Sequence, residues 1–206
     1  MSKAMMTGTV LLLAAAATAA EARVVTFEVV ETESPAFDGR SFGAVGTYDK
    51  LTARVTLAVD PDDPHNGGIV DIGLAPTNSA GEVELATEVH LLRPTDAAKG
   101  NGRLFYDVLN RGRKLGLMLL NDAPAGNDLA GAAAAGNGFL MRAGYTIVWS
   151  GWQPDIATAD SLIGLEVPVL AGVTGMSREE TVLDTDEGHF AVLVSAFFPP
   201  LPFFGC

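Results

Sequence analysis

The chain has 206 residues and a mass of 21.4 kDa, a length that suits one domain or one and a half. Hydrophobic residues make up 48% of it and the mean hydropathy is +0.26, so the chain can bury a sizeable core, which argues against wholesale disorder. Its formal net charge of −12 would repel phosphate backbones, which argues against nucleic acid as a partner.

Residues 1–22 are predicted to be a signal peptide. Lys3 supplies a positive start, Val10 to Ala20 is a largely apolar run, and Ala20-Glu21-Ala22 fits small-x-small cleavage. The run is shorter than the roughly 20 residues that a bilayer-spanning helix needs. We therefore expect an exported protein, periplasmic or secreted, whose mature chain begins near Arg23 and has no membrane span after cleavage.

Residues 23–93 are predicted to form an antiparallel β-meander. Apolar and polar side chains alternate with a period of two, most clearly from Leu51 to Val59, as in strands with one buried face. Connections rich in Pro, Gly, Asn and Asp separate these segments, and short alternating strands joined in this way usually pair antiparallel. The predicted strands are Arg23 to Val30, Tyr48 to Asp60, Ile69 to Leu74 and Val83 to Leu92.

Residues 94–206 are predicted to open with a strand, helix, strand unit, which makes the fold class α/β and β-rich. A nearly continuous apolar run predicts a first strand covered on both faces, and an alanine-rich segment predicts the helix. A right-handed crossover would lay the second strand parallel to the first. The elements are a strand at Leu104 to Leu109, a loop at Asn110 to Asn127, a helix at Leu129 to Arg142 capped by Asn127 or Asp128 and ended by Gly144, and a strand at Tyr145 to Ser150. Further strands are expected at Leu162 to Leu170 and His189 to Phe198.

Two serines match parts of a nucleophile pattern. Gly39-Arg40-Ser41-Phe42-Gly43 fits Gly-x-Ser-x-Gly, but it lacks the preceding buried strand and following helix that a nucleophile elbow needs. A glycine-rich turn is therefore the favoured interpretation. Ser150 ends the predicted parallel strand, where open α/β sheets place their sites. Because no glycine lies two positions before it and no helix follows at once, it is interpreted as part of a wall.

No cofactor and no metal site is predicted. His65, His90 and His189 are scattered without partners at ligand spacing, so each is interpreted as a surface or strand histidine. Cys206 is the only cysteine, which excludes an internal disulfide and a cysteine-based metal cluster. The sequence contains no Walker-type phosphate loop and no Gly-x-Gly-x-x-Gly fingerprint.

The loop at Asn110, Arg111 and Gly112 is the candidate site. A glycine-bearing loop directly after a buried strand can turn backbone N–H groups toward a developing oxyanion, and α/β-hydrolases take one of their two donors from this place. An ordinary strand exit with two solvated arginines is the alternative interpretation.

Several segments together carry a resemblance. They are Phe105-Tyr106-Asp107-Val108-Leu109-Asn110-Arg111-Gly112, Asn121-Asp122-Ala123-Pro124, Gly138 to Tyr145 and Val148-Trp149-Ser150-Gly151-Trp152-Gln153, with Ser41-Phe42-Gly43, Gly46-Thr47-Tyr48 and Asp71 to Pro76 upstream. Over roughly Phe27 to Gly175 the chain resembles a family of bacterial, often exported and mostly uncharacterised α/β-hydrolase-domain proteins.

The resemblance implies a sheet whose strand ending at Asn110 precedes the oxyanion loop and whose next strand ends at Ser150. The nucleophile serine, the acid and the histidine then come later, and members are much longer, so it implies that residues 94–206 are the start of a truncated hydrolase domain. We expect the N-terminal part of an esterase-like serine hydrolase with a small-molecule ester-like substrate when full length, inactive alone and without a nucleophile of its own. The alternative is a non-catalytic exported β-rich binding or assembly module.

Overall fold

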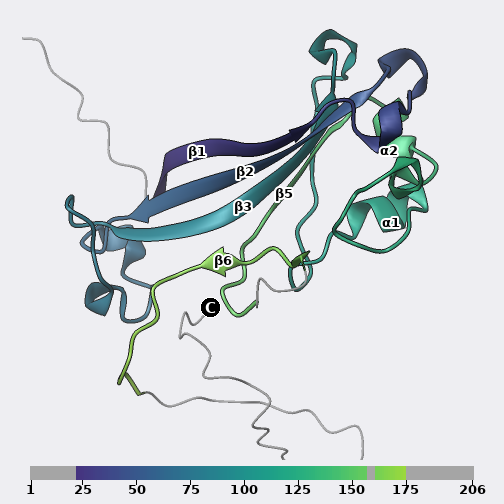
Figure 1. Cartoon of the computed structure of the whole chain (residues 1–206). Helices are drawn as coiled ribbons and strands as arrows, with labels where there is room; N and C mark the ends of the chain where they lie inside the picture. The colour runs from purple at the N-terminus through teal and green to yellow at the C-terminus, as the bar shows by residue number, and fades with distance from the viewer. Residues whose placement is uncertain (1–21, 157–160, 175–206) are drawn as a thin grey trace, which may run out of the picture.

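One twisted six-stranded sheet carries two short helices and several 3-10 turns in the computed structural model, which describes residues 22–156 and 161–174 (Figure 1). Along the sheet the strand order is β1 (Ala22–Glu33), β2 (Tyr48–Val59), β3 (Val83–Pro94), β5 (Thr146–Ser150) and β4 (Leu104–Tyr106), and β6 (Leu165–Glu166) pairs with β3 beside this path. The signal peptide predicted at 1–22 and the strand predicted at His189 to Phe198 lie outside the described residues, except that Ala22 already belongs to β1.

The first three strands form the predicted antiparallel meander. They are β1 (Ala22–Glu33), β2 (Tyr48–Val59) and β3 (Val83–Pro94), each antiparallel to the next. Along β2 the side chains of Ala53 and Val55 are buried while Thr52 and Arg54 are partly exposed. This alternation is the one that the period-two pattern predicts for β2. Three of the four strands expected here are confirmed, but the buried face expected of the first strand is wrong, because Val25, Phe27 and Val29 of β1 are 39%, 53% and 47% exposed.

The strand predicted at Ile69 to Leu74 is wrong. This segment forms turns that end in a 3-10 turn, Ile72–Leu74, after Asp71 takes a left-handed conformation with φ of 58°. Ile72 is buried against Val59 and Val83, at one end of the sheet. The apolar side chains of this segment therefore cover one end of the sheet. A short apolar run in the sequence is compatible with this arrangement as well as with a strand.

The parallel pair is confirmed. Strand β5 (Thr146–Ser150) lies between β3 and β4 (Leu104–Tyr106); it is parallel to β4 and antiparallel to β3. However, β4 is shorter than predicted and is not covered on both faces. Leu104 and Tyr106 on β4 are 61% and 44% exposed, and Val108 just after it is 59% exposed, so one apolar face of this segment is open within the described residues.

The long helix predicted at Leu129 to Arg142 is also wrong. The segment holds a 3-10 turn, Ala132–Ala135, and one helical turn, α2 (Phe139–Arg142), because Gly131, Gly136 and Gly138 all have positive φ. At Gly136 a Cβ would stand 2.1 Å from the carbonyl oxygen of Asn121, so the close approach of two chain segments requires glycine. Gly144, with φ of 77°, does follow the helix end as predicted.

Helix α1 (Gly116–Asn121) lies inside the segment that was predicted to be a loop. Asn121 at its end is fully buried; its side chain accepts from the Leu140 amide at 3.1 Å and donates to the Ala135 carbonyl. This contact joins α1 to α2. Of the strand predicted at Leu162 to Leu170, only β6 (Leu165–Glu166) forms.

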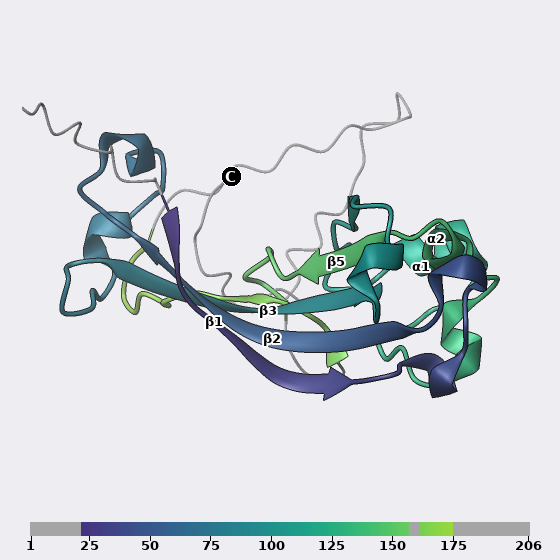
Figure 2. The same cartoon turned by 90° about the horizontal axis from the view of Figure 1, so that it is seen from above.

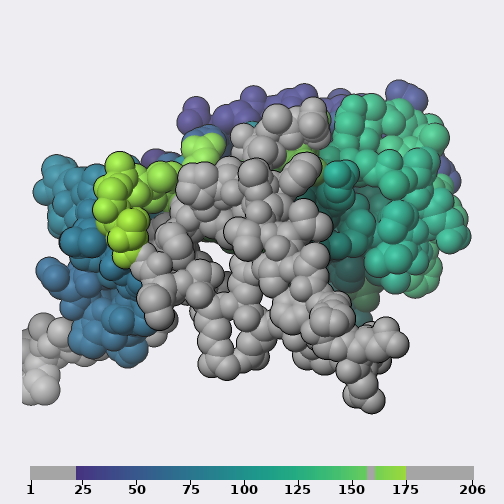
Figure 3. All heavy atoms as spheres, turned by 90° about the horizontal axis from the view of Figure 1, so that it is seen from below, coloured from purple at the N-terminus to yellow at the C-terminus, as the bar shows by residue number. Residues whose placement is uncertain are grey.

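The register assigns the two faces of the sheet. Tyr48, Leu92, Ile147 and Trp149 share one face and pack in the main core with Phe37, Leu117 and Met141, so α1 and α2 cover this face at one end. Figures 1 and 2 show both helices at this end of the sheet. In the space-filling view of Figure 3 the green-teal part of the chain that contains them lies at the opposite end of the molecule from the blue connection at residues 60–82. The other face carries Leu51, Val89, Leu91 and Val148, which are all partly exposed.

Replacement of Tyr48 by phenylalanine tests how the sheet holds the helical end. The Tyr48 hydroxyl is buried and lies 3.1 Å from the Met141 carbonyl and 2.9 Å from that of Tyr145. Tyr48→Phe removes the donor for these carbonyls, and we expect a loss of about 1–3 kcal/mol in the free energy of unfolding, measured by urea denaturation. Tyr106→Phe, which removes an exposed hydroxyl, is the control and should change the free energy of unfolding little. Equal losses in the two variants would contradict the role given to the Tyr48 hydroxyl.

Candidate functional site

The loop at Asn110 to Arg113 leaves the carboxyl side of β4 and forms a tight turn. The amide of Asn110 bonds to the Arg113 carbonyl and the amide of Arg113 to the Asn110 carbonyl. Arg111 and Gly112 have φ of 52° and 75°, so both central residues are left-handed. A Cβ on Gly112 would meet Ile156 and Ile163 at 3.0 Å, so this position also requires glycine for space.

The turn is fastened to the chain that follows β5. The Arg111 amide donates to Oε1 of Gln153 at 2.9 Å, and its guanidinium pairs with Asp155. The Gly112 carbonyl accepts from the Ile163 amide and from the side chain of Asn127. The structure thus brings the three predicted site residues into one turn, but the Arg111 amide already has an acceptor.

The two candidate serines lie apart. Ser41 is exposed between two 3-10 turns, Phe37–Gly39 and Gly43–Val45, without the strand and helix of a nucleophile elbow. Ser150 ends β5, and its hydroxyl lies 2.7 Å from that of Tyr106. Neither arrangement supplies a base to a serine.

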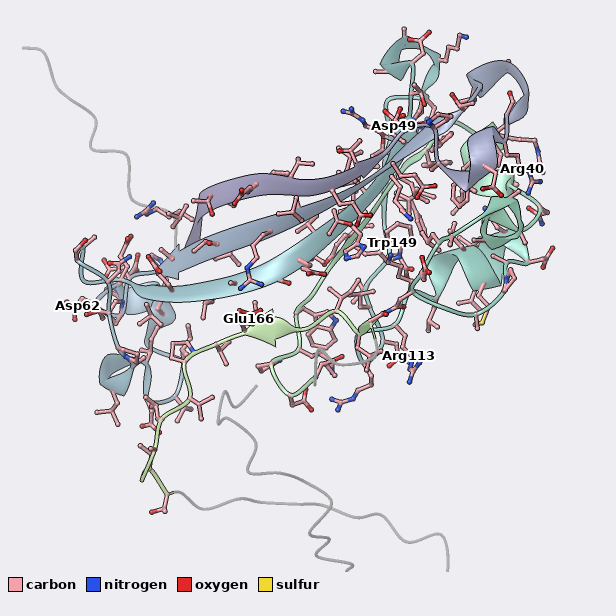
Figure 4. All side chains as sticks on the ribbon, viewed as in Figure 1. Arg40, Asp49, Asp62, Arg113, Trp149 and Glu166 are labelled. Atoms are coloured by element: carbon pink, nitrogen blue, oxygen red, sulfur yellow. The ribbon has the colours of Figure 1, made fainter. Side chains whose placement is uncertain are left out.

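A buried polar network lies beside the loop, beneath α1. Oδ2 of Asp107 accepts three N–H groups: the amides of Leu115 and Gly116, at 3.1 and 2.7 Å, and the indole of Trp149, at 2.6 Å. Trp149 is fully buried, on the side of the sheet that faces α1 (Figure 4). A carboxylate is suited to the first amides of a helix because these have no partner within the helix.

Lys114 continues this network. Only 4% of this residue is exposed; its ammonium lies 4.9 Å from the centre of the Trp149 ring, 2.9 Å from the Asn127 carbonyl and 3.1 Å from Nδ1 of His90. Burial, with a smaller effect of the Lys50 charge, lowers the pKa of Lys114 to about 8. The cation is therefore held by a carbonyl, an imidazole and an aromatic face.

His90 connects the network to a pocket. Burial, and then the charge of Lys114, lowers the pKa of His90 to about 4, so the imidazole is neutral at pH 7. Because an ammonium can only donate, Nδ1 accepts from Lys114 and the ring proton resides on Nε2, which lies 3.2 Å from the Glu88 carboxylate. The contacts thus define the tautomer.

The pocket has a volume of about 500 Å³ and lies between the face of β1 to β3 that carries His90 and the segment 161–166. Arg54 and Glu166 form a bidentate pair at its wall, and Figure 4 shows Glu166 on β6. Its lining mixes charged and neutral groups, among them Glu31, Thr52, Glu88, His90 and Ile163. A mixed polar pocket of this size can hold a small molecule.

The three histidines differ in position. His65 is exposed on the turn Pro64–Asn66 and bonds to Asp63, His90 lies on β3, and His189 is outside the described residues. Within residues 22–156 and 161–174, no group of three His, Cys, Asp or Glu side chains could hold a metal ion. In the same part of the chain, no helix has the length and apolar character needed to cross a membrane.

Asp107, Lys114 and the role of His90 were not predicted from the sequence. Asp107 interrupts the apolar run from Leu104 to Leu109, and a carboxylate inside a predicted buried strand is a signal that a partner is needed. Lys114 gave no such signal, because it lies in a stretch that was interpreted as loop. Only the fold brings it to His90.

Replacement of Asp107 tests the carboxylate that joins β4, α1 and β5. Asp107→Ala leaves two buried N–H groups and a partly buried one without an acceptor, and we expect a loss of about 3 kcal/mol in the free energy of unfolding, measured by denaturant titration. Asp107→Asn keeps one oxygen in place as an acceptor, so its loss in the free energy of unfolding should be less than half that of Asp107→Ala. Equal losses in the two variants would show that the hydrogen bonds to Oδ2 are not what matters.

The lowered pKa of Lys114 predicts that the free energy of unfolding rises with pH in the alkaline range. The unfolded chain holds this proton up to the ordinary pKa of 10.5, whereas the folded chain releases it near 8. Between these values the unfolded state binds more protons, so the free energy of unfolding should rise with pH by up to roughly 3 kcal/mol.

The variant Lys114→Met should lack this rise, and Lys99→Met, at an exposed lysine, should retain it. Chemical denaturation at intervals from pH 7 to 10.5 measures the effect. A rise that persists unchanged in Lys114→Met would assign it to another group.

Comparisons with protein-family models, with curated proteins and with solved structures found no match to this chain.

Proposed function

We propose that this chain forms the leading part of the sheet and one wall of the active site of an exported serine hydrolase that acts on ester-like bonds. In this proposal the turn at Asn110, Arg111 and Gly112 supplies an oxyanion donor, and the nucleophile serine, the acid and the histidine lie outside this chain. The observation that carries it is the parallel pair β4 and β5, with that turn at the carboxyl side of β4.

The geometry supports the proposal in two ways. In α/β-hydrolases one oxyanion donor is an amide in the loop that follows a parallel strand, and this turn follows β4 in that manner. In addition, Leu104 and Tyr106 on β4, and Val108 just after it, are exposed, and β4 forms one edge of the described sheet. Further strands and helices of a larger hydrolase sheet would cover them.

Oxyanion stabilisation would require a free donor. The Arg111 amide now donates to Gln153, whose side chain would have to turn away when substrate arrives. Gln153 is only partly exposed and lies on the segment that follows β5, next to the half-exposed Trp152. A donor that becomes available only on substrate binding is compatible with catalysis, because such hydrogen bonds are often incomplete in the free enzyme.

A second candidate is a non-catalytic exported binding or assembly module. The pocket of about 500 Å³ beside His90 favours it, because this pocket needs no residues from outside the chain. The occupied Arg111 amide is equally compatible with a turn that has only a structural role.

An esterase assay separates the two candidates from a self-sufficient enzyme. The purified 206-residue chain should not hydrolyse p-nitrophenyl acetate or butyrate above the buffer rate, because both candidates assign it no activated serine. Robust turnover that Ser41→Ala or Ser150→Ala abolishes would overturn the assignment of the nucleophile to another part of the protein.

Thermal unfolding then distinguishes the two candidates from one another. The binding module predicts one cooperative transition for residues 23–206, whereas a sheet that needs further strands should melt broadly or aggregate. The DNA downstream of codon 206 offers an independent check, since the hydrolase proposal expects it to encode Gly-x-Ser-x-Gly after a strand.

A further inference from the structure

One histidine–lysine contact joins three separate parts of the chain. His90 on β3 accepts from Lys114, and Lys114 donates to the Asn127 carbonyl. The side chain of Asn127 in turn binds the Lys114 amide, the Gly112 carbonyl and the Ser161 carbonyl, at 2.7 to 2.8 Å. Asn127 thus joins the turn at 110–113 to the segment at 161–163, and the His90–Lys114 contact links both to the sheet.

The contact can form only with a neutral imidazole. Lys114 presents donors alone, so Nδ1 of His90 must offer a lone pair, and the single ring proton is then on Nε2 toward Glu88. A second ring proton would turn Nδ1 into a donor. Two donors and two positive charges would then face each other across 3.1 Å in a buried place.

We propose that the His90–Lys114 contact is an acid-operated latch, in which protonation of His90 separates the two side chains and releases the Asn127 anchor of the turn at 110–113. Glu88 stays within reach of the protonated ring through Nε2, so His90 keeps one partner while Lys114 loses one. The latch concerns the conformation of the turn and holds whether or not that turn acts in catalysis.

The charged groups around His90 decide which state prevails. On its own strand Glu88 favours the protonated ring, whereas Lys114 and, across the sheet, Lys50 disfavour it. From the other elements, Glu31, Glu166 and Arg54 line the same pocket as His90, with Arg54 and Glu166 paired to each other. Asp107 and Asp128 act on Lys114 and favour its charge.

The balance keeps the latch closed at neutral pH. Burial and Lys114 lower the pKa of His90 to about 4, so the ring stays neutral until the pH falls to that region. The unfolded chain takes up its histidine proton earlier, near the ordinary value of 6.5. The stability that the neutral contact contributes is therefore complete above about 6.5 and is lost as the pH falls through about 4.

An NMR titration of the full chain tests the latch. The Cε1–Hε1 signal of His90 should titrate with a midpoint near 4, and long-range ¹⁵N correlations at pH 7 should show the proton on Nε2. In Lys114→Met the midpoint should shift upward, because the opposing charge is gone while the burial of the ring remains. A midpoint near 6.5 in the unaltered chain, or a proton on Nδ1, would overturn the proposal.

Tryptophan emission reports the opening itself. In a Trp152→Phe background Trp149 is the only remaining tryptophan, and its emission should change with the midpoint of His90 while the far-ultraviolet circular dichroism stays constant. His90→Asn keeps an acceptor for Lys114 without a titrating ring and should remove the change. His65→Gln, at an exposed histidine, should leave it as it was. An emission change that survives in His90→Asn would assign the transition to carboxylates and refute the latch.

Discussion

Three N–H groups from separate parts of the chain meet on one carboxylate oxygen of Asp107. Two belong to the amides at the start of α1 and one to the indole of Trp149 on β5, so this oxygen holds the end of β4, the helix and the neighbouring strand together. The position of α1 then places Lys114 over the indole ring and against His90. Because a buried N–H without an acceptor is costly, the whole helical end of the sheet depends on this side chain.

From that anchor the two candidate functional features follow. The turn at Asn110 to Arg113 lies between the end of β4 and Lys114, and Asn127 fastens it from one side and Gln153 from the other. The pocket lies between the sheet and the segment 161–166, and His90 belongs both to its lining and to the buried network. A lysine with a lowered pKa reduces stability at neutral pH, and such groups cluster at functional sites, so this network is the part of the molecule in which chemistry or regulation is most expected.

The elements that sequence patterns predicted well are those whose pattern comes from one buried face. Strand β2 alternates because its partners on both sides make it a half-buried surface, and the parallel pair β4 and β5 follows from two apolar runs joined by a crossover. The predicted helix at Leu129 to Arg142 failed because local alanine content favours helix, whereas Gly136 must accommodate the Asn121 carbonyl from a distant segment. The apolar run at Ile69 to Leu74 failed for a similar reason, since its burial comes from the end of the sheet rather than from strand pairing.

By itself the sequence determined the acidic charge, the β-rich α/β class, the meander and the place of the glycine-bearing turn after β4, because composition and periodicity are local properties of the chain. Only the tertiary structure decided which polar groups meet. His90, Lys114 and Asn127 come together through strand register and helix placement, as do Asp107 and Trp149. Contacts between residues distant in the chain leave no periodic pattern in the sequence. The protonation state of His90 and the hydrogen bonds that hold the turn at 110–113 can therefore be known only from the folded structure.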